Sequence, residues 1–224
     1  MLFRSLKEYK KGCLQKMFPR GDADVPEVRF PGFTGAWERR KLGEVVGLFG
    51  GYAFSSNDSA ESGVRWLKIA NVGMGHIKWD DESFLPSSYL EEYSAYRLKL
   101  GDYVMALTRP ILDGELKIAE ITEDDILLNQ RVAKIIFNCD KRFGYQLLRK
   151  RSTVELIENE LSGTDPPNLS GNTLSNIYVH IPCLSEQEKI GTFFADLDNL
   201  IALNQRECEK YKELKKGLLQ QMFV

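Results

Sequence analysis

The sequence is poor in the residues and patterns from which most active sites are built. It has two histidines, His76 and His180, and four scattered cysteines without a C-x-x-C pair, so neither a zinc site nor a disulfide framework is supported. It also contains no Walker loop, no G-x-S-x-G elbow and no H-E-x-x-H motif. We therefore expect no catalytic residue, no metal and no cofactor.

Long apolar runs are missing as well. No run approaches the roughly 20 residues of a membrane-spanning helix, and the first residues, MLFRSLKEYKKG, lack the apolar core and cleavage site of a secretory signal. A hydrophobic content of 43% and a charged content of 28% are ordinary for a globular protein. Unpaired thiols fit the reducing cytoplasm, and 224 residues allow one good core or two small domains.

The charge of the chain is nearly balanced, with a formal net charge of −2. Basic side chains are nevertheless concentrated in two segments. Residues 1–20 carry six basic side chains and one acidic side chain, and Lys141–Arg151 carries five basic side chains and no acid. Such clusters are usually solvated faces, but they are also where contacts to phosphates are expected.

A short segment occurs twice, once at each end of the chain. Leu6–Phe18 and Tyr211–Phe223 are identical at nine of thirteen positions, without a gap, at a single offset of 205 residues. Similar composition can make two helices alike, but it rarely reproduces an ordered pattern such as KKGxLQxMF. We interpret the pair as a duplication, and a repeat confined to the two ends does not indicate a solenoid.

The C-terminal segment has the pattern of a long helix, expected over Glu186–Met222 with a capping box between Ser185 and Glu188. It would be about 55 Å long, which is too long to bury its apolar stripe on a small domain, so we expect a partner helix. The alternative is packing on its own domain. Steps of four and three residues define a heptad seam: Ile190, Phe194, Leu197, Ile201, Asn204, Cys208, Tyr211, Lys215, Leu218 and Met222.

The N-terminal copy continues the same seam through Leu6, Cys13 and Met17. A helix this short is marginal in isolation, so we expect it to dock on the long helix. In the seam, the polar Asn204 would favour one register over others.

The region between the repeats alternates short apolar runs with turn residues. Its pattern predicts a mixed, largely antiparallel α+β domain with one helix over Phe143–Leu161. The expected divisions are residues 1–18, 19–184 and 185–224. The strand-like runs are Arg65–Asn71, Asp102–Thr108, Leu116–Thr122, Arg131–Phe137 and Ile177–Pro182.

The segment Gly163–Gly171 contains Asp165-Pro166-Pro167, the first half of the Asp-Pro-Pro-aromatic motif of DNA amino-methyltransferases. In that motif the aromatic ring stacks on the flipped base. Asn168 stands at the aromatic position, and no glycine-rich loop for S-adenosylmethionine is present. We interpret the segment as a rigid polar loop and not as a catalytic site.

Several stretches together resemble the specificity (S) subunit of type I restriction-modification systems, over essentially the whole chain. No single stretch is specific to this family, but their ordered combination is. They are Val28–Val46, Leu128–Ile135, Ser162–Pro182, Leu184–Ile201 and the tail KELKKGLLQQMF.

This resemblance implies a non-catalytic, double-stranded-DNA-binding subunit with a target recognition domain. Methyltransferase (M) subunits that methylate adenine would dock on its conserved helix, and a restriction (R) subunit would join through them. S subunits typically contain two recognition domains, whereas this chain contains one, so it resembles a half-subunit. We expect a homodimer through the Glu186–Met222 helices, with each N-terminal helix completing the bundle. The alternatives are a fragment of a longer subunit and pairing with a different half.

Base reading requires polar side chains presented from loops. The groups around Ser55 and Arg109 are favoured, and Gln130 and Arg131 are more typical of framework. The candidate DNA-binding residues are Tyr52, Ser55, Ser56, Asn57, Lys68, Asn71, Thr108, Arg109, Asn129, Gln130, Arg131, Asn168, Ser170 and Asn172.

Two other classes of function stay open. The chain could be a recognition fragment of a fused DNA methyltransferase or restriction enzyme, or a coiled-coil interaction protein without a role on DNA.

Overall fold

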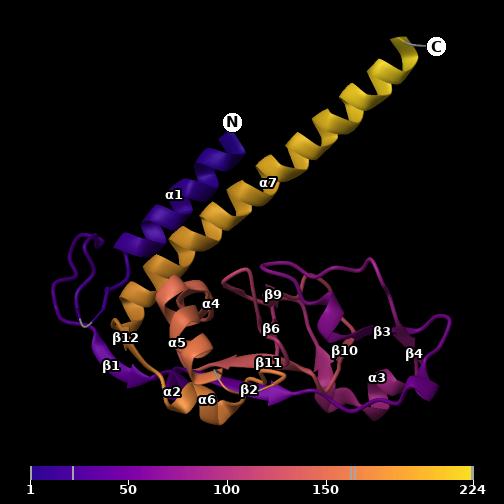
Figure 1. Cartoon of the computed structure of the whole chain (residues 1–224), viewed down its shortest axis with the longest axis horizontal. Helices are drawn as coiled ribbons and strands as arrows, with labels where there is room; N and C mark the ends of the chain where they lie inside the picture. Colours follow the sequence, from indigo (N-terminus) through magenta and orange to yellow (C-terminus); the bar gives the residue numbers. More distant parts are fainter. Residues whose placement is uncertain (1, 22, 162, 164, 223–224) are drawn as a thin grey trace.

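The computed structural model describes residues 2–21, 23–161, 163 and 165–222, without the side chains of residues 2–4, 221 and 222. Figure 1 shows a body of small sheets and short helices from which one long helix projects, with the N-terminal helix lying beside the first half of that helix. This is the expected mixed α+β fold with a long C-terminal helix. The chain divisions at residues 18 and 184 stay a prediction.

The helices differ strongly in length. No helix in the described part of the chain is long and apolar enough to cross a membrane. The α-helices are α1 (Leu2–Lys16), α2 (Leu42–Val45), α3 (Tyr89–Glu92), α4 (Lys141–Arg149), α5 (Arg151–Leu161), α6 (Gly171–Ser175) and α7 (Leu184–Met222), and the 3-10 turns are η1 (Ser56–Asp58), η2 (Ile69–Asn71) and η3 (Ser94–Tyr96).

The strands form two four-stranded sheets and two small pairs. The first sheet has the order β2-β11-β6-β9 and the second β4-β3-β10-β5, while β1 pairs with β12 and β7 with β8. The strands are β1 (Glu38–Lys41), β2 (Val46–Gly50), β3 (Val64–Leu67), β4 (Phe84–Leu85), β5 (Arg97–Leu98), β6 (Tyr103–Ala106), β7 (Ile111–Leu112), β8 (Glu115–Leu116), β9 (Ile118–Glu120), β10 (Ile126–Leu128), β11 (Val132–Phe137) and β12 (Tyr178–Ile181).

Among these strands, β3 and β10 pair in parallel and the other pairs are antiparallel. Four of the five strand-like runs contain a whole strand, and Arg65–Asn71 overlaps β3 before it ends in η2, so the strands are confirmed there. The apolar pattern succeeded because strands such as β6, in which all four residues are buried, read as continuous apolar runs.

The helix expected over Phe143–Leu161 is two helices. Lys150 adopts an extended backbone (φ −63°, ψ 131°) that ends α4, and α5 begins at the next residue. The single-helix prediction is therefore wrong. The break was missed because no proline or glycine marks it in the sequence. Asp140 caps the start of α4 by accepting a hydrogen bond from the Phe143 N–H at 2.9 Å.

α7 packs closely against the first turn of α4. A Cβ added to Gly191 of α7 would lie 2.4 Å from Asp140 Oδ1 and 2.8 Å from the Phe143 nitrogen, so this close approach requires glycine. α7 begins at Leu184, which places Ser185 inside the helix and makes the capping box predicted there wrong. Glu186, in the first turn, is instead held by Arg29 through two bonds of 2.6 and 2.7 Å.

Phe18, immediately after α1, joins four parts of the chain. It is 1% exposed. Its ring stacks on Phe143 of α4 at 5.4 Å between centroids and lies 5.7 Å from Trp37 and 6.2 Å from Phe194 of α7. We call these four rings the aromatic junction. The predicted docking of the N-terminal helix on the long helix is confirmed.

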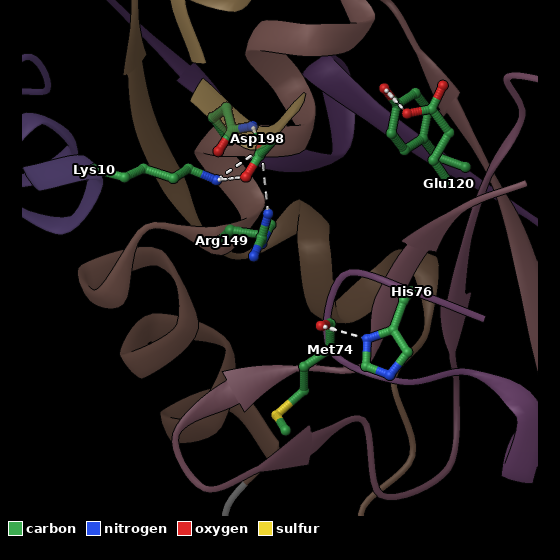
Figure 2. A network of polar contacts seen from close by, with 8 residues as sticks. Lys10, Met74, His76, Glu120, Arg149 and Asp198 are labelled. Atoms are coloured by element: carbon green, nitrogen blue, oxygen red, sulfur yellow. Dashed lines mark hydrogen bonds and ion pairs between the residues drawn. The ribbon is translucent and has the colours of Figure 1, made fainter. Parts of the chain in front are cut away.

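An ion-pair network joins α1, α4 and α7 (Figure 2). Lys10 Nζ of α1 donates to both carboxylate oxygens of Asp198 on α7, at 2.6 and 2.7 Å. Gln146 Nε2 donates to the same carboxylate at 2.9 Å, and Arg149 lies 3.6 Å from it. Burial, reinforced by Arg149, lowers the pKa of Lys10 to about 8, while Asp198 opposes that shift.

Replacing Phe18 by alanine tests the aromatic junction. We expect Phe18→Ala to lower the free energy of unfolding by about 3–5 kcal/mol, because it removes a buried ring and leaves a cavity. The control is Leu156→Ala on α5, an exposed site, where we expect a change within about 0.5 kcal/mol. Urea unfolding measures both variants. Equal effects would contradict the role of the aromatic junction.

Candidate nucleic-acid interface

At one end of the β2-β11-β6 sheet, the chain leaving β2 runs beside the turn that precedes β11. The Tyr52 N–H donates to the Leu128 carbonyl at 2.9 Å, and the Gln130 N–H donates to the Tyr52 carbonyl at 3.0 Å. Tyr52 also forms an isolated parallel bridge with Asn129. Two of the predicted groups, Tyr52 and Gln130–Arg131, are therefore neighbours.

This pairing depends on Gly51. A Cβ at that position would lie 2.3 Å from the carbonyl oxygens of both Leu128 and Asn129, which is closer than real contacts allow. Asn129 is itself buried, and its Oδ1 accepts a hydrogen bond from the Arg131 N–H at 3.2 Å. Asn129, a candidate for DNA contact, is therefore a structural residue of the turn.

The loop after β6 joins the polar loop sixty residues later. The Arg109 N–H donates to the Pro167 carbonyl at 2.8 Å, and Thr108 Oγ1 donates to Asn168 Oδ1 at 3.2 Å. The Leu107 N–H also donates to the Arg131 carbonyl at 2.9 Å, so this loop lies between the other two segments.

Four separately predicted groups thus meet at one place, which we call the polar edge. Arg109 is exposed there and has a left-handed backbone with φ of 47°. In the described part of the chain neither Arg109 nor Arg131 has an ion-pair partner. The polar edge consists of Tyr52, Thr108, Arg109, Gln130, Arg131 and Asn168.

The remaining loop candidates have local roles. Ser55 caps η1 by accepting from the Asn57 N–H at 3.1 Å, and Ser170 caps α6 by accepting from the Thr173 N–H at 3.2 Å. Each of these two serine caps fixes the start of a short helical segment. The other members, Ser56, Asn57 and Asn172, are exposed.

Asn71 was expected to contact DNA, but it is only 2% exposed. Its side chain accepts from the Lys68 N–H at 2.9 Å and donates to the carbonyls of Lys78 and Asp81. No polar atom of its amide is left for a base, so we omit Asn71 from the interface. Lys68 is partly covered, donates to Ser83 at 2.8 Å and lies 4.0 Å from the Trp66 ring centroid.

Next to the polar edge lies an aromatic cluster that the sequence analysis missed. The Tyr52 ring is 4.7 Å from Tyr93 and 5.3 Å from Tyr96. Desolvation is the main cause, and the nearby Glu92 a smaller one, of a rise in the pKa of Tyr93 to about 12, so its hydroxyl stays neutral. The three- and four-residue spacing of Tyr89, Tyr93 and Tyr96 is the signal that could have revealed the cluster.

The predicted helix seam separates into a covered part and an open part. Ile190, Phe194 and Leu197 are buried within the chain, and Asn204 Nδ2 donates to its own helix at the Leu200 carbonyl. Along the rest of the seam, Ile201 is half-buried, Cys208, Tyr211, Lys215 and Leu218 are exposed, and the Met222 side chain lies outside the described residues; in α1, Leu6 and Cys13 are half-buried and Met17 is buried.

No group of three or more metal-ligating side chains occurs among the described residues. The groups available in the polar edge are guanidinium, amide and hydroxyl donors and acceptors. Such groups suit recognition of phosphates and base edges.

Comparison with known proteins identifies the family. Residues 35–214 match the family of the type I restriction modification DNA specificity domain. The chain belongs to this family, and it is therefore a specificity-subunit chain of type I restriction-modification systems.

Two curated relatives are specificity subunits. The MjaVIII specificity subunit of Methanocaldococcus jannaschii is 36% identical over 227 residues, covering 96% of this chain and 52% of the relative. The EcoAI specificity subunit of Escherichia coli is 30% identical over 216 residues, covering 92% and 34% respectively. The chain thus spans about half the length of these relatives or less.

A solved structure supports the fold. The HsdS subunit from Thermoanaerobacter tengcongensis superposes with a TM-score of 0.57 at 20% identity, covering 92% of this chain and 46% of that one.

Glycine substitutions test the packing behind the polar edge. We expect Gly51→Ala to lower the free energy of unfolding by about 1–3 kcal/mol, because the added Cβ meets backbone oxygens that must move. A Cβ on the adjacent Gly50 meets nothing within 4 Å, so Gly50→Ala should leave stability unchanged or slightly higher. Chemical unfolding compares the two variants. A harmless Gly51→Ala would show that the two segments are not held this closely.

Proposed function

We propose that this chain binds double-stranded DNA and reads one half of a split target, and that M subunits docked on its helices methylate adenine there. The observation that carries the proposal is the polar edge, where four segments bring amide and hydroxyl groups beside two arginines that have no ion-pair partner among the described residues. Family membership supports it, as does the fact that the relatives are specificity subunits.

The side chains of the polar edge divide by chemistry. An arginine can pair with O6 and N7 of guanine, and a glutamine or asparagine with N6 and N7 of adenine. Arg109 and Asn168, on adjoining loops, are the proposed base readers. Gln130 and Arg131 follow the structural turn at Asn129, so we assign them to positioning, with Arg131 available to a phosphate.

The proposed assembly is cytoplasmic and follows the family. The chain itself would carry out no chemistry, and an R subunit would join through the M subunits. Two copies would associate through α7, giving a homodimer that presents two polar edges related by a twofold axis. The two half-sites of the DNA target would then be identical and inverted.

Co-expression with an M subunit and mapping of methylated adenines tests this proposal. We expect a split motif with two inverted, identical halves. An asymmetric motif would favour pairing with a different half. Absence of salt-dependent DNA binding by the M complex would favour a coiled-coil protein without a role on DNA.

Arg109 offers the sharpest test of base reading. We expect Arg109→Ala to weaken binding of the M complex to its target by about 1–3 kcal/mol and to relax specificity at one position. Arg40→Ala on β1, where the arginine bonds Glu44, serves as the control and should bind as the unmodified protein does. Titration against target and random DNA measures both. Unchanged discrimination in Arg109→Ala would remove Arg109 from the base readers.

A further inference from the structure

α1 covers one face of the first half of α7. Lys10 lies in the ion-pair network at 6% exposure, and Met17 and Phe18 are buried. Lys10 contacts Asp198, whereas the later Phe18 contacts the earlier Phe194, so the two helices run antiparallel. Figure 1 shows that α1 lies beside only the first half of α7, so the last described turns of α7 lie beside no other element.

Those last turns carry a copy of α1. At the offset of 205 residues, Lys10 corresponds to Lys215 and Cys13 to Leu218. In α1 these positions face α7, whereas Lys215 and Leu218 are exposed, Leu218 to 53%. The chain therefore has one docking face on α7 and two segments with the chemistry to occupy it.

The face that α1 covers is incompletely filled. A groove of about 460 Å³ remains between α1, the loop at Phe30 and Phe193 of α7, with Tyr9 and Cys13 in its lining. The copy has leucine in place of both residues of α1, Leu214 for Tyr9 and Leu218 for Cys13. At Cys13 the replacement adds apolar volume where the groove lies, which favours the copy by burial.

A second copy of the chain can supply that segment without violating symmetry. If Lys215 takes the place of Lys10 against the partner's Asp198, the two α7 helices run antiparallel, and the same pair forms again on the other side of the twofold axis. The midpoint of residues 198 and 215 then lies between Arg206 and Glu207. The tail cannot reach its own Asp198, because α7 is one continuous helix.

We propose that α1 occupies, within each chain, the docking site for the α7 tail of a second copy, so that the two segments compete for one face of α7. This inference rests on the homodimer in the proposed function, and it assigns α1 the role of a competitor instead of an additional member of the bundle. α1 is tethered, so its effective concentration at the site is about millimolar. Only a chain whose site is free of α1 can bind the tail of another copy. The apparent affinity between copies therefore decreases as the fraction of such chains decreases.

Neutral substitutions at the two equivalent lysines separate the alternatives. Lys10→Met weakens α1 while Asp198 keeps Gln146 and Arg149, so the dimer association constant should rise about tenfold. Lys215→Met leaves α1 intact and removes a pair formed twice in the dimer, so the constant should fall about tenfold. Sedimentation equilibrium measures each constant, and urea unfolding verifies that each variant folds.

The neighbouring lysines provide matched controls. Lys11 and Lys216 are also equivalent in the repeat, and both are exposed. Lys11→Met and Lys216→Met carry the same charge change and should leave association unchanged. A decrease for Lys10→Met would show that α1 helps to build the dimer and would overturn the competition. An unchanged constant for Lys215→Met would overturn docking of the tail at Asp198.

A cysteine pair tests the register directly. In this register residue 204 of one copy lies opposite residue 209 of the other, one position from the native Cys208, so we expect a cysteine at 204 to reach Cys208 as a disulfide. Asn204→Cys should give a covalent dimer on oxidation, and Asn204→Cys with Cys208→Ser should not. A dimer without this cross-link would overturn the register and leave the homodimer intact. If every variant is a monomer, with and without M subunits, the homodimer is overturned as well. DNA reading is tested separately, by methylation mapping.

Discussion

The packing of Phe18 against three other aromatic rings is the contact on which the arrangement of the whole chain depends. Its neighbours belong to the loop before β1, to α4 and to α7, so one side chain connects the N-terminal helix, the folded body and the projecting helix. Apolar burial has no preferred direction. The direction of α7 is set by its close approach at Gly191 and by the pairing of Arg29 with Glu186.

Local patterns in the sequence were sufficient for most individual elements. The α7 helix and the five strand-containing runs follow from periodicity, because each has an apolar face that must be buried. The break at Lys150 and the start of α7 could not be read in this way. Lys150 is flanked by neither proline nor glycine, and the first turn of α7 lacks the polar cap expected at Ser185.

Residue type predicted which chemical groups the candidate interface contains better than it predicted which residues belong to the interface. Asn71 and Asn168 are the same amino acid, yet Asn71 is buried with its amide bonded to nearby backbone, whereas Asn168 is exposed beside Thr108. The place of Asn168 depends on backbone bonds between segments far apart in the chain, such as Arg109 to Pro167. The aromatic cluster was missed because Tyr52 lies far in sequence from Tyr93 and Tyr96, so the rings meet only after folding.

The repeat at the two ends also bears on how such chains can be joined. A polypeptide that continued from the end of α7 into a second body at Pro19 would pass through the same residues that now link α1 to the body, because KKGxLQxMF precedes both points. The last turns of one long helix would then serve as the first helix of the next unit. A tandem gene could thus arise by recombination within this short repeated stretch, with no new linker and no change to the residues that meet the aromatic junction.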